Sequence, residues 1–242
     1  MHKPKVVLLH GMLGLPRFLW REYFHNVQPM LEGMGLQVIA PRLPWAGTIK
    51  MRADSLFEQL KDEPGPLHLI AHSMSGIDAR ACITHMNSHA NIASLTTLST
   101  PHHGSSAADY VLSGFSLFRL LSSLADLTPE AMHTFNEQTP DHPNVIYRSY
   151  NAARPVQELP WLTRRYGRTI EAEEGDNDSQ VSVLSAQWGK HVKTLYADHF
   201  EIIGLNLWLN PFRRRKHFDH MPLYREIAEW IIHFEQEKEG RK

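Results

Sequence analysis

One serine stands where an apolar strand is expected to turn directly into a helix. The stretch from Leu69 to Gly76 (LIAHSMSG) places Ser73 between the small residues Ala71 and Ser75, which would let strand and helix approach each other. Such a turn forces its apex residue into a strained conformation and lifts the side chain clear of the sheet. The pattern predicts Ser73 as a nucleophile. The alternative is a serine that only caps the helix.

A glycine-rich loop offers the groups that such a nucleophile needs. The stretch His10 to Gly14 (HGMLG) directly follows the first apolar run. Its glycines would let the backbone N–H of Met12 turn toward Ser73, and the helix start after Ser73 offers the N–H of Met74. Two such donors stabilise the oxyanion of a tetrahedral intermediate, which is the largest single term in acyl transfer. We therefore expect an oxyanion hole made by Met12 and Met74; the alternative is an ordinary glycine turn.

A serine nucleophile also needs a base and an acid that follow it in the chain. Because the chain has 16 histidines, position must select the base. His199 follows the apolar run Val192–Tyr196 and is the expected base, with His220 as the alternative. A turn-rich acidic loop offers Asp176 and Asp178, and either could orient the imidazole by a charge-assisted hydrogen bond. The carboxylates of this loop could instead bind Ca²⁺ or face solvent.

Composition limits what kind of protein carries these residues. The 242 residues are 42% apolar, and we expect one domain over residues 1–242. The net charge of −1 argues against a nucleic-acid binder. The single cysteine, Cys82, excludes an intramolecular disulfide and is expected to pack in the core. Because Val6–Leu9 is too short for the core of a signal peptide, we expect a cytoplasmic protein, unless a leader was removed. No transmembrane segment is expected.

Short apolar runs alternate with stretches of helical periodicity along the chain. Runs without polar alternation are typical of strands that are covered on both faces. We expect strands at Lys5–Leu9, Leu36–Ala40, Leu67–Ala71, Ser94–Leu98, Val145–Tyr150 and Val192–Tyr196. We expect amphipathic helices at residues 24–34, 49–60, 79–86 and 223–234. This alternation predicts an α/β fold with a mostly parallel central sheet, helices on both faces, and a site at the carboxyl ends of the strands.

Two further segments suggest contact with apolar ligands. More than forty residues separate Leu98 from Val145, too many for a simple crossover, so we expect a lid insertion over residues 104–143. Its substrate-binding face would comprise Phe115, Leu117, Phe118 and Leu121. An ordinary buried helix is the alternative. The segment 205–216, which ends in three arginines and Lys216, could dock on an anionic lipid surface or form a solvated basic loop.

Taken together, five motifs resemble those of the α/β-hydrolase superfamily, specifically the bacterial and mitochondrial-type triacylglycerol lipases. Residues 10–14 resemble the oxyanion loop, 71–80 the nucleophile elbow, 99–105 the T-P-H-[RK]-G-S strand end, 177–182 the N-D-G-x-V-S acid loop and 198–201 the D-H-[LF]-[DE] base loop. The departures are Ala71, Ser75 and Ser179 in place of glycine, and His103 in place of a basic residue.

The resemblance implies a particular site and activity. It selects Asp178 over Asp176 and implies a Ser73–Asp178–His199 triad. Secreted members of the family carry a structural calcium, and Glu201 would match one ligand; no other metal or cofactor is expected. The implied activity is hydrolysis of medium- or long-chain acyl-ester lipids through an acyl-enzyme, with peripheral contact to a lipid interface.

Other activities stay open at this stage. A short-chain carboxylesterase, a thioesterase and an acyltransferase would use the same triad. A protein of the same fold that binds a hydrophobic ligand without turnover is a further alternative.

Overall fold

A six-stranded parallel sheet forms the centre of the computed structural model, which describes residues 3–12, 17–18, 21–85, 92–113, 122–208 and 215–240. Adjacent strands pair in parallel throughout. Across the sheet the order is β4 (Gln37–Ile39), β1 (Lys5–Leu9), β5 (Leu67–His72), β6 (Ile92–Leu98), β7 (Ile146–Ala152) and β8 (Lys190–Leu195). A separate antiparallel pair joins β2 (Arg17–Phe18) to β3 (Arg21–Glu22).

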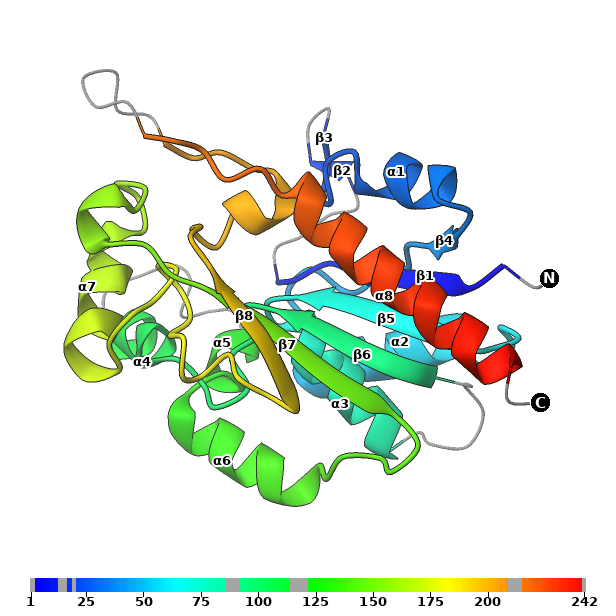
Figure 1. Cartoon of the computed structure of the whole chain (residues 1–242). Coiled ribbons are helices and arrows are strands. Elements are labelled where there is room, and N and C mark those ends of the chain that lie inside the picture. The colour runs from blue at the N-terminus through cyan, green and yellow to red at the C-terminus, as the bar shows by residue number, and fades with distance from the viewer. Residues whose placement is uncertain are drawn as a thin grey trace.

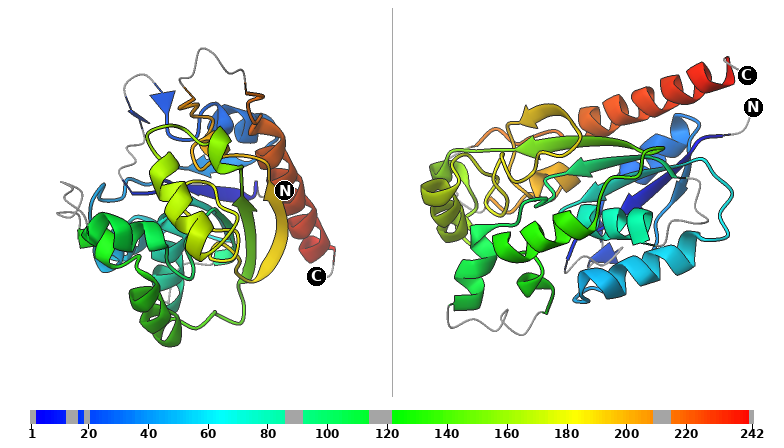
Figure 2. Two further views of the ribbon diagram at one scale, coloured as in Figure 1. Left: turned by 90° about the vertical axis from the view of Figure 1, so that its left-hand side faces the viewer. Right: turned by 90° about the horizontal axis from the view of Figure 1, so that it is seen from below.

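Helices cover both faces of the sheet, as the views in Figures 1 and 2 show. Helices α1 (Val27–Gly33) and α8 (Met221–Glu239) pack on one face, where Val6 and Leu8 of β1 point. On the other face, α2 (Ile49–Leu60), α3 (Ser75–His85) and α6 (Pro129–Gln138) pack over Val7 and Leu9. Alternate residues of one strand therefore enter two separate apolar cores, which explains why the strand has no polar alternation.

Local sequence signals account for where several helices begin. The Thr48 hydroxyl accepts a hydrogen bond from the Met51 N–H at 3.3 Å and caps α2. Thr128 caps α6 in the same way, with Pro129 in the first turn. Four apolar residues of α2 are buried, and Arg52 of the same helix is buried with them; the four are Ile49, Ala53, Leu56 and Leu60.

The remaining helices lie in the segments that follow β6, β7 and β8. They are α4 (Ser106–Ser113), α5 (Ser122–Ala125), η2 (Val156–Glu158), α7 (Arg164–Glu173) and η3 (Glu201–Ile203). Helices α4 and α7 lie side by side beyond the sheet (Figure 1). No helix of the described segments is long and apolar enough to cross a membrane.

The predicted α/β fold is confirmed, and each of the six predicted strands overlaps an observed one. One interpretation is wrong: the last strand is not covered on both faces. Leu195 is the only buried residue of β8, because this strand is at the edge of the sheet and has a single neighbour.

The predicted lid region contains at least one helix of the core. Met132 of α6 is fully buried against the sheet, so the range 104–143 is more than a cap. The four predicted lid residues, Phe115, Leu117, Phe118 and Leu121, lie outside the described residues. A lid over the site therefore stays a prediction.

Candidate active site

Ser73 stands at the apex of a tight turn between β5, which ends at His72, and α3, which begins at Ser75. Its φ of 60° is in the left-handed region, which is unusual for a residue with a side chain. Two hydrogen bonds hold this conformation: the Ser73 N–H donates to the Leu98 carbonyl at 3.0 Å, and the Thr100 hydroxyl donates to the Ser73 carbonyl at 2.7 Å. The surrounding structure thus maintains the strained backbone that presents the Ser73 hydroxyl.

The small residues around Ser73 allow this turn in different ways. A Cβ atom at Gly76 would lie 2.3 Å from the Thr100 hydroxyl oxygen, so only glycine fits there. Ser75 fits although related motifs have glycine at its position. It is buried, and its Oγ lies 2.7 Å from the Leu9 carbonyl oxygen and 2.8 Å from that of His72. The hydroxyl therefore ties the helix start to the ends of two strands.

Gly11, in the segment that follows β1, packs directly against the turn. A Cβ atom at Gly11 would lie 2.9 Å from the Ser73 Cβ, which places the next residue, Met12, beside the nucleophile candidate. Among the hydrogen bonds of the described residues, none uses the backbone N–H of Met12 or Met74. Both predicted oxyanion donors are therefore available for a ligand.

Two side chains fix the path of this loop. His10 Nε2 accepts from the Leu43 N–H at 3.1 Å, so its Nδ1–H donates to the Gly11 carbonyl at 3.0 Å. Burial lowers the pKa of His10 to about 4, which keeps this ring neutral at pH 7. The Arg52 guanidinium donates to the His10 carbonyl at 2.9 Å and pairs with fully buried Asp78 of α3 at 2.7 Å.

The structure brings Asp178 and His199 together. Asp178 Oδ2 accepts from His199 Nδ1 at 2.8 Å, and the Asp178 carbonyl accepts from the His199 N–H at 2.9 Å. Asp178 Oδ1 accepts from the N–H groups of Gln180 and Val181 at 2.9 and 2.8 Å. Because Nδ1 carries the donated proton, Nε2 is free to accept one, which is the tautomer that a general base needs.

The alternative acid and base lie elsewhere. Asp176 is exposed to solvent and makes no described contact with His199. His220 donates from Nε2 to the His25 carbonyl at 2.8 Å, on the α8 side of the molecule. The carboxylate and imidazole that the structure brings together are therefore those that the lipase-like motifs select.

His199 lies beside the turn that carries Ser73. Its ring centroid is 4.5 Å from that of His72, the residue before Ser73. The described hydrogen bonds include none between Ser73 Oγ and His199, and catalytic hydrogen bonds of this kind often tighten only when substrate binds.

A second chain of hydrogen bonds, which sequence reasoning missed, connects the oxyanion loop with the His199 loop. The His199 carbonyl can only accept, so His72 Nε2 donates to it at 3.0 Å, and His72 Nδ1 must accept from the Tyr23 hydroxyl at 2.8 Å. The Tyr23 oxygen in turn accepts from the Gly11 N–H at 3.0 Å. Burial lowers the pKa of His72 far below its usual value, in agreement with a neutral ring. No spacing in the sequence indicates that Tyr23 reaches this position.

Comparison with known proteins agrees with the α/β fold described above. Residues 49–138 match the model of the PGAP1-like alpha/beta domain. Triacylglycerol lipase 2 of Saccharomyces cerevisiae is 35% identical over 212 residues, which are 78% of this chain and 63% of that protein. The chain is thus similar to a triacylglycerol lipase over most of its own length.

Two further proteins extend the comparison. The triacylglycerol lipase of Pseudomonas fragi is 31% identical over 147 residues, which are 58% of this chain and 49% of that lipase. The crystal structure of Staphylococcus hyicus lipase shares the fold with a TM-score of 0.79 at 19% identity, over 98% of this chain and 97% of that one. The chain thus spans less than two thirds of the length of each of these two lipases.

Proposed function

We propose that this protein hydrolyses carboxylic esters through an acyl-enzyme on Ser73. The observation that carries the proposal is the Asp178–His199 hydrogen bond of 2.8 Å beside a serine held at a φ of 60°. Acyl transfer requires a serine presented by a strained turn, an oriented imidazole and two available backbone donors. The names of the relatives, both triacylglycerol lipases, support the same reading.

Each residue has a definite task in this reaction. Ser73 Oγ attacks the ester carbonyl while His199 Nε2 takes its proton, and the Met12 and Met74 N–H groups bind the resulting oxyanion. His199 then gives the proton to the leaving alcohol, which leaves the acyl group on Ser73. A water molecule, deprotonated by His199, then attacks the acyl carbonyl. The carboxylic acid is released, and His199 returns the proton to Ser73. Asp178 holds the imidazole and stabilises its protonated form.

The substrate class that we propose is an acyl-ester lipid of medium or long chain. Each buried methylene of an acyl chain contributes roughly 0.8 kcal/mol, about fourfold in binding, as long as the pocket continues. We expect kcat/KM for p-nitrophenyl esters to rise from acetate to at least octanoate. A maximum at acetate with a steep loss by hexanoate would contradict the lipase reading and favour a short-chain esterase.

We further propose that the protein contacts a lipid interface peripherally. Arg215, which belongs to the basic segment expected to make this contact, takes no part in it. Arg215 is buried and paired with two carboxylates, so it is not a free cation of a basic loop. Arg213 and Arg214 lie outside the described residues. Exposed Trp161 and Leu162, which precede α7, provide apolar surface for such contact. Binding to sedimented anionic vesicles tests this part. The expected cytoplasmic location stays a prediction that cell fractionation tests.

Hydrolysis of the p-nitrophenyl ester series by the purified chain tests the proposed activity. We expect burst or steady-state release of p-nitrophenol by the unmodified protein and loss of that release in Ser73→Ala. Turnover of acyl thioesters above that of the matched oxygen esters would instead assign a thioesterase. Binding of fatty acid without any turnover would assign a ligand-binding protein.

A further inference from the structure

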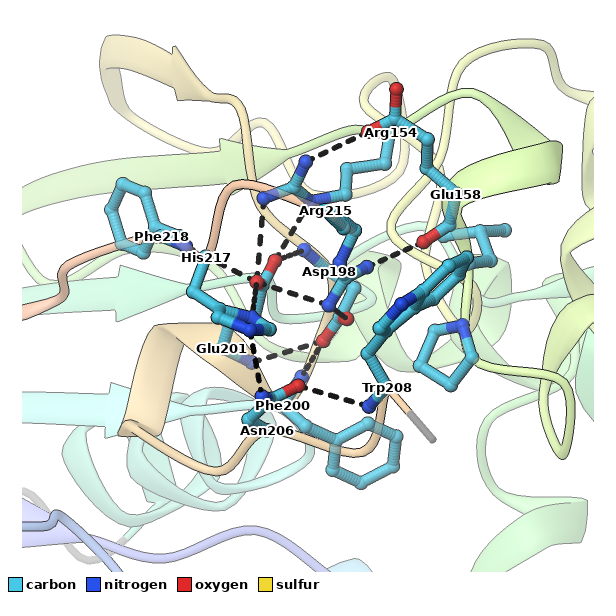
Figure 3. A network of polar contacts seen from close by, with 12 residues as sticks. Arg154, Glu158, Asp198, Phe200, Glu201, Asn206, Trp208, Arg215, His217 and Phe218 are labelled. Atoms are coloured by element: carbon cyan, nitrogen blue, oxygen red, sulfur yellow. Dashed lines mark hydrogen bonds and ion pairs between the residues drawn. The ribbon is translucent and has the colours of Figure 1, made fainter. Parts of the chain in front are cut away.

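Behind His199 lies a buried cluster of two arginines and two carboxylates, shown in Figure 3. Arg154, which follows β7, binds Glu201 with both arms of its guanidinium, Nε to Oε2 at 2.7 Å and Nη2 to Oε1 at 3.3 Å. Arg215 places Nη2 2.8 Å from Asp198 Oδ2 and 3.0 Å from Glu201 Oε1. These four side chains are each at most 3% exposed. Half-exposed Glu158 adds a further ion pair to Arg154 at 2.9 Å.

The cluster encloses the turn that carries His199. Asp198 Oδ1 accepts from the Phe200 and Glu201 N–H groups at 2.9 and 3.0 Å, and Glu201 Oε2 accepts from the Asp198 N–H at 3.0 Å. This reciprocal pattern is that of a capping box, and His199 lies inside it. Because the two carboxylates fix the backbone on both sides of His199, whatever holds the carboxylates also holds the imidazole.

The same arginine also reaches the acid loop. The Arg154 backbone N–H donates at 3.0 Å to the carbonyl of Asn177, the residue before Asp178. Its guanidinium Nη2 donates at 3.0 Å to the Lys216 carbonyl. Arg154 therefore links the acid loop, the base loop and the segment that carries Arg215.

The calcium implied by the resemblance to secreted lipases does not fit these residues. Every carboxylate oxygen of Asp198 and Glu201 already accepts from a guanidinium or a backbone N–H, and Phe218 N–H adds a third donor at Glu201 Oε1. Two guanidinium cations also supply the charge that a divalent ion would bring. Within the described part of the chain, no three His, Cys, Asp or Glu side chains are arranged to hold a metal ion.

Cations are needed at this place for a physical reason. Burial raises the pKa of Asp198, the nearby Glu201 charge raises it further, and the Arg215 guanidinium opposes both. Without the arginines, two adjacent buried carboxylates would repel each other and distort the turn.

We propose that Arg154 and Arg215 are positioning residues for His199, and that their guanidinium groups stand where a divalent cation would otherwise be required. This inference rests on the proposed function, because it assigns these residues to the reaction of Ser73. Activity should then be independent of calcium, and it should depend on the arginines through kcat rather than through substrate binding.

The first test compares Arg154→Gln with Arg148→Gln in hydrolysis of p-nitrophenyl butyrate. Arg148 is a matched control because it is also buried, lies on β7 and packs over Trp230, away from the His199 loop. We expect Arg154→Gln to lower kcat by roughly 10- to 100-fold with little change in KM, and Arg148→Gln to retain kcat within about twofold. Equal kcat in the two variants would overturn the positioning role.

Arg154→Lys keeps the charge but not the two-armed contact. It should therefore retain more kcat than Arg154→Gln but less than the unmodified protein. If Arg154→Gln does not fold, Arg154→Lys takes its place in the comparison, and a kcat equal to that of the unmodified protein overturns the proposal.

The second test measures dependence on calcium in the unmodified protein. We expect millimolar EDTA and millimolar CaCl2 to leave both the hydrolysis rate and the thermal midpoint unchanged, because a cation that bound the native state would raise that midpoint. A rate lost in EDTA and restored by Ca²⁺, or a midpoint raised by Ca²⁺, would overturn the proposal. The midpoint can be read even if no ester is hydrolysed, so failure of the proposed function and failure of this inference are distinguishable.

Discussion

Replacing Ser179 by glycine should stabilise the protein, against the usual effect of glycine. Ser179 follows the acid Asp178 and has a φ of 91°, where a side chain is strained. Its Oγ is buried, and among the described residues it has no hydrogen-bond partner. The Ser179 side chain thus destabilises the folded state in two ways, through backbone strain and through a buried hydroxyl without a partner.

The expected magnitude follows from these two destabilising effects and two opposing ones. Left-handed backbone costs a residue with a Cβ about 1–2 kcal/mol, and a buried unsatisfied hydroxyl costs about 1–3 kcal/mol. Two effects of the substitution oppose this gain. Glycine raises the entropy of the unfolded chain, which destabilises the folded state by roughly 0.5–1 kcal/mol, and loss of the packed Cβ destabilises it by a similar amount. Ser179→Gly should therefore raise the free energy of unfolding by about 1–3 kcal/mol.

Ser182 provides a matched control in the same loop. It is also buried, but its φ is not positive, and its Oγ accepts from the Ser185 N–H at 3.0 Å. Ser182→Gly should lower the free energy of unfolding by about 1–2 kcal/mol. Urea unfolding of both variants measures the difference. If Ser179→Gly destabilises the protein as much as Ser182→Gly does, the argument from strain is refuted.

Three further predictions concern protons and the site. Burial lowers the pKa of His68 and His10 from 6.5 to about 4. As the pH falls, these histidines are therefore protonated in the unfolded chain before they are protonated in the folded protein, and the free energy of unfolding should decrease as the pH drops from 6.5 toward 4. Each histidine accounts for a loss of up to about 3 kcal/mol in the free energy of unfolding over this pH range. His68→Gln should therefore reduce the slope of the free energy of unfolding against pH, and an unchanged slope contradicts this. Asp178→Asn should lower kcat for p-nitrophenyl butyrate by roughly 10³- to 10⁴-fold, and a loss of less than about tenfold would reject its assignment. Tyr23→Phe should lower kcat by roughly tenfold at similar KM, since His72 loses its partner, and an unaltered kcat would exclude a positioning role for this hydroxyl.

The parts of the fold that could be predicted were those that local sequence determines. Buried parallel strands have uninterrupted apolar runs, so Leu67–Ala71 was recognised as the strand before Ser73, and β5 extends it by one residue. The small residues of the turn indicated the direction change that the φ of Ser73 records. The exposure of β8 could not be read in this way, because it depends on the order of strands across the sheet.

The contacts between distant segments lay beyond sequence reasoning. Arg154 and Glu201 are separated by 46 intervening residues, and only the crossover from β7 to β8 brings them together. Arg215 belongs to a run of basic residues, a pattern that indicates a solvated or lipid-facing loop. Its burial follows from the two carboxylates beside His199, which attract it from outside the site.

Labelling by a fluorophosphonate tests the central claim most directly, because this reagent forms a stable bond only with an activated serine. Peptide mass spectrometry of the labelled protein should find one equivalent on Ser73. Ser73→Ala, with a thermal midpoint close to that of the unmodified protein, should take up none. Stoichiometric labelling that persists in Ser73→Ala, or no labelling of the folded unmodified protein, would contradict the assignment of Ser73 as the nucleophile.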